Sequence, residues 1–231
     1  MPTLRILSAG AAQAVTERVI QAFKGDTGCD VTADFGAVGA MKARMVGGEN
    51  VDVIVLTRAM IEELEAAQMV APASRVDLGT VATGIAVRAG GRLPDITDGE
   101  RLRSVVLASR VLVCPDPAIA TAGKVVMALL EKLGVAQVME GRLRFFPNGY
   151  AAMRWLAENG TGEDLGITQA TEILANEGVA YAGPLPRGHQ VNTVYSTAAA
   201  SSAHEPALAR DFVSRYSDAT GRAWLRDAGY E

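Results

Sequence analysis

The most chemically loaded stretch of the sequence is Thr168-Gln169-Ala170-Thr171-Glu172. It directly follows Asp164-Leu165-Gly166-Ile167, whose apolar character is typical of a buried strand. The stretch therefore stands where a strand ends and a helix begins, which is the edge at which open α/β sheets bind ligands. Two interpretations stay open, a binding site and a plain helix start, because Thr and Glu are also favoured there as backbone caps.

Further polar side chains stand between other predicted strands and the helices that follow them. They belong to Thr121-Ala122-Gly123, Asn148 and Arg58. The Thr121 hydroxyl is placed either to bind a ligand or to cap a helix, and the Arg58 guanidinium lies either in a site or on a solvated rim. Asp52 stands at the start of its strand, where we expect it to accept hydrogen bonds from backbone donors.

The sequence opens with a turn of very small residues between a strand and a helix. The apolar run from Leu4 ends at Ser8-Ala9-Gly10-Ala11, after which apolar residues recur at helical spacing. Gly36-Ala37-Val38-Gly39-Ala40 repeats this arrangement. Such turns let backbone N–H groups approach a ligand, and the first N–H groups of a helix attract anions. The alternative is a strand–turn–helix unit of the kind that any α/β protein contains.

The order of apolar strands and amphipathic helices predicts the fold class. Continuous apolar runs are typical of strands in a parallel sheet, and several of them lead into residues at helical spacing. The clearest predicted strands are residues 4–7, 29–35, 51–56, 81–87, 111–114, 144–146, 164–167 and 191–197. Alternation of this kind indicates an α/β protein.

Composition and charge exclude several classes of protein. The chain has 231 residues, of which 49% are hydrophobic and 21% charged, and its net charge is −4. This describes a globular protein without the basic stripe of a nucleic-acid binder. The sequence contains two cysteines and two histidines, so we predict neither a metal site nor a cofactor.

The expected partner is a small anionic ligand, with no nucleic acid and no membrane insertion. No apolar run approaches the roughly 18 residues that a membrane span needs. We expect a monomer or a weak dimer. Because no secretory leader follows Met1, the expected compartment is the cytoplasm, or the periplasm if a leader precedes this sequence.

Taken together, the segments resemble the molybdate-binding-protein family of type II periplasmic binding proteins. The resemblance rests on the order of Leu7-Ser8-Ala9-Gly10, Gly36-Ala37-Val38-Gly39, Gly48-Glu49 with Asp52-Val53, Gly166-Ile167 and Gly183-Pro184-Leu185-Pro186. It implies two α/β lobes joined by two crossover strands, with hinge closure on a ligand in the cleft between them. Lobe 1 would comprise residues 1–82 plus 188–231, and lobe 2 residues 83–187.

The sequence departs from this family at the positions that hold the oxyanion. The family uses serine hydroxyls in the first and second turns. The matching positions here are Gly10 or Ala11, and Val38, whose side chains cannot donate a hydrogen bond, while Ser8 lies one or two positions early. The chain more closely resembles the aconitate isomerase subgroup, which acts on a tricarboxylate. The segments that fit this subgroup are Ser8–Ala11, Thr121–Gly123, Asn148-Gly149 and Thr168–Glu172.

That resemblance implies an isomerase that moves a carbon–carbon double bond by 1,3 proton transfer. The reaction needs donors that hold the carboxylates and stabilise a developing dienolate. The donors would be backbone N–H groups near Ala9–Ala11, Val38–Ala40 and Ala122–Gly123, together with the Arg58 guanidinium. The remaining ligand-binding candidates are Ser8, Gly39, Thr121, Asn148, Thr168, Gln169 and Thr171.

The reaction also needs a group that carries the proton, and the candidates are Glu172, Tyr150 and His189. Glu172 is preferred, because burial would raise the pKa of its carboxyl towards the working range. Tyr150 could instead pack against the ligand, and His189 could lie on the surface of a hinge loop.

The alternative function is a non-catalytic receptor of the transporter type for molybdate, another oxyanion or an organic acid. The sequence has no Ser–His–Asp arrangement and no phosphate-binding lysine motif. Gly36-Ala37-Val38-Gly39 lacks the third glycine of a dinucleotide-binding fingerprint.

Overall fold

The computed structural model describes residues 2–231 and divides the chain into two compact units. Unit 1 comprises the residues up to Val81 together with Val194–Glu231, and unit 2 comprises Ala82–Thr193. Both boundaries lie inside strands, so the chain passes between the units within β4 (Val76–Arg88) and returns within β9 (Asn192–Ala199). Ala82 and residues 188–193, which the sequence prediction had assigned to lobe 1, belong to unit 2.

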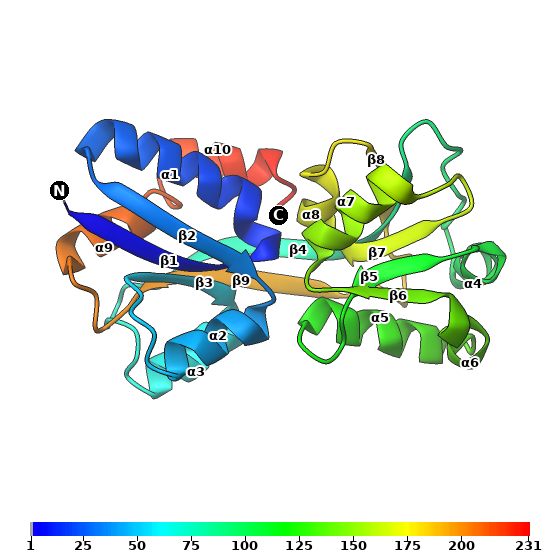
Figure 1. Ribbon diagram of the computed structural model, residues 1–231, viewed down its shortest axis with the longest axis horizontal. Helices are drawn as coiled ribbons and strands as arrows, with labels where there is room; N and C mark the ends of the chain where they lie inside the picture. The colour runs from blue at the N-terminus through cyan, green and yellow to red at the C-terminus, as the bar shows by residue number, and fades with distance from the viewer. Residues whose placement is uncertain (1) are drawn as a thin grey trace. The chain divides into compact units, whose positions relative to one another are not determined.

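Unit 1 is built on a sheet with the strand order β2-β1-β3-β9. The strand β1 is parallel to β2 and β3, and β9 is antiparallel to β3. In Figure 1, α1 and α10 cover one face of this sheet and α2 and α3 the other. Besides the parts of β4 and β9, the elements of the unit are β1 (Thr3–Ala9), η1 (Gly10–Ala12), α1 (Gln13–Thr27), β2 (Asp30–Gly36), α2 (Val38–Val46), β3 (Val53–Thr57), α3 (Arg58–Ala66), α9 (Pro206–Ser214) and α10 (Ala219–Asp227).

Unit 2 has a sheet with the order β4-β7-β5-β6, and β8 pairs with β4. Here β5 is parallel to β6 and β7, whereas β4 is antiparallel to β7 and β8. Its elements are α4 (Gly99–Ala108), β5 (Leu112–Pro115), α5 (Thr121–Lys132), α6 (Ala136–Met139), η2 (Glu140–Arg142), β6 (Leu143–Phe146), α7 (Gly149–Asn159), β7 (Leu165–Gln169), α8 (Ala170–Leu174) and β8 (Val179–Pro184).

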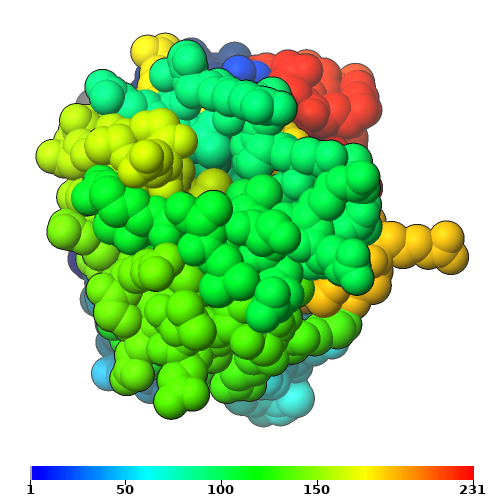
Figure 2. All heavy atoms as spheres, turned by 90° about the vertical axis from the view of Figure 1, so that its right-hand side faces the viewer, coloured from blue at the N-terminus to red at the C-terminus, as the bar shows by residue number. Residues whose placement is uncertain are grey.

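Both faces of the unit 2 sheet are buried, as the continuous apolar strands predicted. Leu112 and Cys114 of β5 pack into one core with α4 and α5, and Val113 packs into a second core with Met153 of α7. Alternate residues of a strand point to opposite faces, so a strand covered on both sides must be apolar throughout. Figure 1 shows α7 and α8 on one face and α5 on the other. The face of unit 2 that carries α4 and α6 is turned to the viewer in Figure 2.

These results confirm the predicted α/β class and the parallel core strands. One prediction was too short: β4 begins at Val76, whereas the sequence indicated a strand only from Val81. The extra residues include Asp77, Gly79 and Thr80, which interrupt the apolar pattern. Among residues 2–231, none of the helices combines the length and the apolar composition that crossing a bilayer requires.

The buried Asp52 fixes the start of β3, as predicted. Its Oδ2 accepts a hydrogen bond from the backbone N of Arg5 at 2.7 Å, and its Oδ1 accepts one from the backbone N of His204 at 2.8 Å. The carboxylate therefore joins β1 to the segment that leads into α9.

We expect Asp52→Ala to lower the free energy of unfolding by about 2–4 kcal/mol, because it leaves two backbone donors without an acceptor. Urea unfolding measures this. Asp227→Ala is the matched control, since Asp227 is an exposed carboxylate paired with Arg18 at 3.5 Å, and we expect its loss to change stability by less than about 0.5 kcal/mol. Equal effects of the two variants would contradict the role given to Asp52.

Candidate functional site

In unit 1 the carboxyl ends of three parallel strands meet at one edge of the sheet. Ala9 at the end of β1 pairs with Gly36 at the end of β2, and Ser8 pairs with Val55 of β3. The helical elements η1, α2 and α3 all begin at this edge. The structure thus brings together three segments that the sequence analysis had singled out separately.

Two of these helical starts have no side-chain cap. Ala9 precedes η1 and Ala37 precedes α2, and neither residue offers a side-chain acceptor to the helix. By contrast, Thr57 caps α3, since its Oγ1 accepts a hydrogen bond from the backbone N of Met60 at 3.4 Å. The first N–H groups of η1 and α2 therefore have no side-chain acceptor at their caps.

The hydroxyl of Ser8 makes its hydrogen bond within the chain. Its side chain is fully buried, and its hydroxyl donates to the carbonyl of Ala9 at 3.1 Å. Val38, the first residue of α2, is also buried, and Gly39 is half-buried. At this edge the polar groups that come from Ala9–Ala11 and Val38–Gly39 are therefore those of the backbone.

Arg58 supplies a positive charge at the same edge, and Asp77 orients it. The guanidinium Nη2 donates to Asp77 Oδ2, and the Ser196 hydroxyl donates to Asp77 Oδ1 at 2.6 Å. Burial alone would raise the pKa of Asp77, but the hydrogen bonds from Ser196 and Arg58 outweigh it and hold that pKa below its usual value. Asp77 therefore stays ionised and keeps Arg58 in place.

The Arg58 guanidinium keeps unused hydrogen-bonding capacity. Its side chain is 43% exposed, and its Nε has no partner among the described residues. Asp77 and Ser196 were missed in the sequence analysis, because Asp77 lies in the part of β4 that was not recognised. No local signal marked it, because Asp77, Gly79 and Thr80 interrupt the apolar pattern of the strand.

Unit 2 repeats the arrangement at the ends of β5, β6 and β7. These parallel strands end at Pro115, Phe146 and Gln169, and α5, α7 and α8 follow them. Thr121 is the first residue of α5, but it does not cap the helix, because the cap position is Ala120 and carries no side-chain bond. The plain-cap interpretation of Thr121 is therefore wrong.

Asn148 and Gly123 have structural roles at this edge. The Asn148 Oδ1 accepts a hydrogen bond from the backbone N of Ala151 at 2.8 Å and so caps α7. A Cβ on Gly123 would lie 2.4 Å from the Pro115 carbonyl oxygen. Only glycine therefore lets α5 approach the loop after β5 so closely.

A buried carboxyl joins α7 to the end of β7. The backbone N of Gly149 donates to Glu172 Oε1 at 3.1 Å, and the Thr168 hydroxyl donates to Glu172 Oε2 at 2.5 Å. A Cβ on Gly149 would lie 2.0 Å from both Glu172 Oε2 and Thr168 Oγ1. Gly149, which the sequence analysis named only as part of the Asn148-Gly149 segment, therefore gives Glu172 access to the N-terminus of α7.

Burial raises the pKa of the Glu172 carboxyl above its ordinary value of 4.5. The hydrogen bonds from Thr168 and from the backbone near Gly149 act in the opposite direction but do not cancel the effect. The predicted direction of the shift is confirmed. Glu172 is thus a carboxyl that holds its proton to higher pH than an exposed glutamate does.

The other two candidate proton carriers lie in different surroundings. Tyr150 is half-buried, directly follows Gly149, and has the Arg154 guanidinium over its ring at 5.5 Å. His189 lies beside the start of α4, where a Cβ on Gly99 would approach its Nε2 to 2.7 Å. It also lines a small hollow with the second half of α5, including Leu129 and Lys132. Of these two residues, Tyr150 is connected to Glu172 through its backbone, which donates a hydrogen bond to the Glu172 carboxyl.

Gln169 and Thr171 are buried polar residues with spare hydrogen-bonding capacity. Gln169 is 1% exposed and Thr171 is 3% exposed. The Gln169 Oε1 and the Thr171 Oγ1 have no partner among residues 2–231. The same holds for Thr83 Oγ1 on the neighbouring strand β4, a residue that the sequence analysis did not consider.

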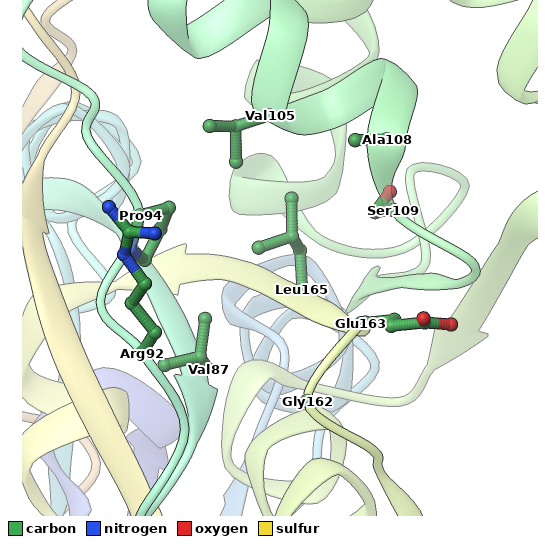
Figure 3. Close-up of a pocket in the computed structure, with 9 residues that line it drawn as sticks. All are labelled: Val87, Arg92, Pro94, Val105, Ala108, Ser109, Gly162, Glu163 and Leu165. Carbon is green, nitrogen blue, oxygen red and sulfur yellow. The ribbon is translucent and has the colours of Figure 1, made fainter.

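A separate hollow lies at the opposite edge of the unit 2 sheet. It has a volume of about 380 Å³ and is lined by Leu165, the first residue of β7, together with Val87, Arg92, Val105 and Glu163 among others. Figure 3 shows that the Glu163 carboxylate points away from the other labelled side chains. Because its polar groups do not converge, this hollow is a weaker candidate than the strand ends.

Metal binding gains no support from the described side chains. Among residues 2–231 no group of three or more His, Cys, Asp or Glu side chains is arranged to hold a metal ion. The groups described above are backbone donors, Arg58, buried hydroxyls and the Glu172 carboxyl.

Comparisons with known proteins agree with the fold. An aconitate isomerase from a Pseudomonas species is 26% identical over 237 residues, covering 98% of this chain and 87% of that protein. The periplasmic molybdate-binding protein of Azotobacter vinelandii superimposes with a TM-score of 0.79 and 22% identity, covering 99% of this chain and 98% of the other. The sulfate-binding protein of Mycobacterium tuberculosis gives a TM-score of 0.77 at 15% identity, covering 100% and 86%.

These structural likenesses show the fold, which is that of the type II periplasmic binding proteins. The resemblance drawn from the order of the sequence segments is therefore confirmed. A family model for the bacterial extracellular solute-binding proteins matches residues 4–231, almost the whole chain. The chain belongs to the bacterial extracellular solute-binding protein family.

Proposed function

We propose that the protein binds a small organic polycarboxylate and moves its double bond by 1,3 proton transfer. The observation that carries the binding part is the distribution of helix caps. Among the helical elements that begin at the strand ends, α3 and α7 are capped by the side chains of Thr57 and Asn148. By contrast, η1, α2, α5 and α8 have no side-chain cap. The N–H groups that a side chain does not cap are the ones proposed to bind an anion from outside the chain.

Two features favour a carboxylate over a tetrahedral oxyanion. Ser8 uses its hydroxyl internally, and Gly10, Ala11 and Val38 have no hydroxyl to offer. Arg58 can instead meet a carboxylate with its planar guanidinium, a geometry that favours paired hydrogen bonds. The identity of 26% to an aconitate isomerase, over 98% of this chain, supports the same class of ligand.

The proposed reaction is an allylic proton shift. A base removes a proton from the carbon next to a carboxylate, and the electron pair of the C–H bond moves into a dienolate. A proton is then delivered at the far end of the allyl system, and the double bond is displaced by one position. The backbone donors and Arg58 stabilise the charge of the dienolate, and no oxidant or cofactor is needed.

Glu172 is the preferred proton carrier. Because its pKa is raised, the protonated and the ionised forms of the carboxyl coexist at a pH closer to the working range. Its oxygens are held by Thr168 and Gly149, so exchange with a ligand runs through the Thr168 hydroxyl or follows a movement of the carboxyl. Tyr150 is the second candidate because it is half-buried next to Gly149.

A non-catalytic receptor is the second candidate function. The family assignment and the structural likeness to molybdate- and sulfate-binding proteins favour it. The receptor would use the same uncapped helix starts to bind an oxyanion or an organic acid without reaction. Both candidate functions require the predicted small anionic ligand. The cytoplasmic location and the oligomeric state stay predictions.

The two functions are separated by NMR spectroscopy of candidate acids in heavy water. We expect the wild-type protein to catalyse deuterium incorporation into unsaturated tricarboxylates, or their isomerisation. Glu172→Gln should lower that rate by about 100-fold or more while leaving ligand affinity within a few-fold. Binding of acids or oxyanions without any exchange would leave the receptor and remove the enzyme.

A second prediction concerns the pH dependence of stability. The folded protein binds the Glu172 proton more tightly than the unfolded chain does, because the folded pKa lies above 4.5. The stabilisation that Glu172 provides is therefore complete below pH 4.5 and is lost as the pH rises through the folded pKa. Urea unfolding between pH 4 and pH 8 should show wild type losing stability relative to Glu172→Gln as pH rises. A difference that is constant or has the opposite sign would contradict the raised pKa.

The third prediction concerns Arg58. Arg58→Met should weaken the binding of a polycarboxylate by about 10- to 100-fold, since hydrogen bonds to a charged group are lost. Calorimetric titration measures the dissociation constant. Arg18→Met is the matched control, because Arg18 is an exposed arginine of the same unit with a surface partner, Asp227. If both variants bind like wild type, Arg58 does not contact the ligand.

A further inference from the structure

Thr83 occupies a position where its neighbours on the same strand face are apolar. Val81 and Ile85, two residues before and after it, are fully buried, and Thr83 itself is 1% exposed. Residues two apart in a strand point to the same face. The row Val81-Thr83-Ile85 therefore carries one hydroxyl in an otherwise apolar face, at a place where valine would fill the same volume.

Both backbone hydrogen-bonding groups of Thr83 already have partners. Its N donates to the carbonyl of Val191 at 2.9 Å, and its carbonyl accepts from the N of Leu185 at 3.0 Å. The side-chain Oγ1, by contrast, is buried without a hydrogen-bond partner among residues 2–231. A buried hydroxyl left in this state destabilises the protein, so its retention calls for an explanation.

Gln169 lies directly opposite Thr83. The two residues are paired on the antiparallel strands β7 and β4, which places their side chains on the same face, with Cβ atoms about 4.5–5.5 Å apart. The Gln169 Nε2 donates to Thr193 Oγ1 at 3.3 Å, so the side chain extends from β7 towards the start of β9. Thr83 lies on the strand between them, since its N–H is bonded to Val191. All three residues belong to unit 2.

The far end of the Gln169 amide is also unpartnered. It is assigned as Oε1, but the Thr193 hydroxyl can either accept or donate, so the amide can turn and keep that bond. With the amide turned, its N–H₂ group and the Thr83 hydroxyl are two donors on the same face of the sheet. Two neighbouring donors suit the two oxygens of a carboxylate.

We infer that Thr83 and Gln169 form an uncharged subsite that binds one carboxylate group of the ligand. The inference rests on the proposed function and names the residues of unit 2 that recognise the acid. In this arrangement Thr193 holds the Gln169 amide and is a positioning residue. The Thr83 hydroxyl serves to bind the ligand, and it lowers the stability of the protein without ligand.

Thr83→Val tests the subsite because it moves two measurements in opposite directions. The variant removes an unsatisfied buried hydroxyl without changing the shape of the side chain. We therefore expect its urea midpoint to be equal to or higher than that of wild type. Its affinity for a polycarboxylate, measured by calorimetric titration with cis- and trans-aconitate, should fall by about 10-fold.

The contrary outcomes are distinct. If Thr83→Val lowers the urea midpoint and leaves the affinity unchanged, the hydroxyl is satisfied by an internal water and the subsite is wrong. If both acids bind wild type and the variant equally and the midpoints agree, Thr83 has no role in recognition. Failure of wild type to bind any acid in the panel would instead overturn the proposed function itself.

Ligand chemistry and a matched variant sharpen the assignment. Replacing one carboxylate of the ligand by a methyl ester should reduce the affinity of wild type. For the ester of the carboxylate that Thr83 and Gln169 bind, wild type should no longer bind more tightly than Thr83→Val. Thr16→Val is the control, since Thr16 is a buried threonine of unit 1 whose Oγ1 accepts from the Tyr216 hydroxyl at 2.8 Å. It should lower the urea midpoint and leave acid binding unchanged. An equal loss of affinity in both variants would contradict a specific subsite.

Discussion

The parallel pairing of core strands is the constraint on which the rest of the structure depends. Parallel strands need a crossover connection, so each strand end is followed by a turn and a helix that packs against the sheet. With β1 between β2 and β3, and β5 between β6 and β7, three helix starts meet at one edge in each unit. Helix N-termini carry partial positive charge, so the topology itself creates two edges that attract anions.

Side chains then decide which of these helix starts remain open. Asn148 caps α7 from the preceding turn, and the buried Glu172 carboxyl also reaches the Gly149 N–H, so this start is largely satisfied by the chain itself. Ala37 and Ala120 leave α2 and α5 without a side-chain cap. In the proposed function, selectivity for an external anion comes as much from the helix starts that lack a side-chain cap as from the hydroxyl groups that the chain supplies.

Much of this fold could be predicted from sequence because the signals were local. Small residues at Ser8–Ala11 and Gly36–Ala40 follow apolar runs, and that pattern marks a strand end and a helix start without knowledge of the partner strands. The start of β4 was missed because Asp77, Gly79 and Thr80 are atypical of a strand. Asp77 and Thr80 are satisfied by distant groups, the Ser196 hydroxyl at 2.6 Å from Asp77 and the backbone carbonyl of Glu231 at 2.8 Å from the Thr80 N. Such partners, over 100 residues away, are invisible to a local pattern.

The candidate site shows the same division between local and distant information. The composition of the stretch from Thr168 to Glu172 identified it as a candidate site. The sequence could not show that Thr168 faces Glu172 and Gly149, while Gln169 faces Thr83. That alternation follows from the last two residues of a strand pointing to opposite faces. One face thus receives a buried carboxyl that holds its proton, and the other receives uncharged hydrogen-bonding groups. In the proposed function, the two residues at this strand end separate proton transfer from ligand recognition, with partners supplied by the neighbouring strands.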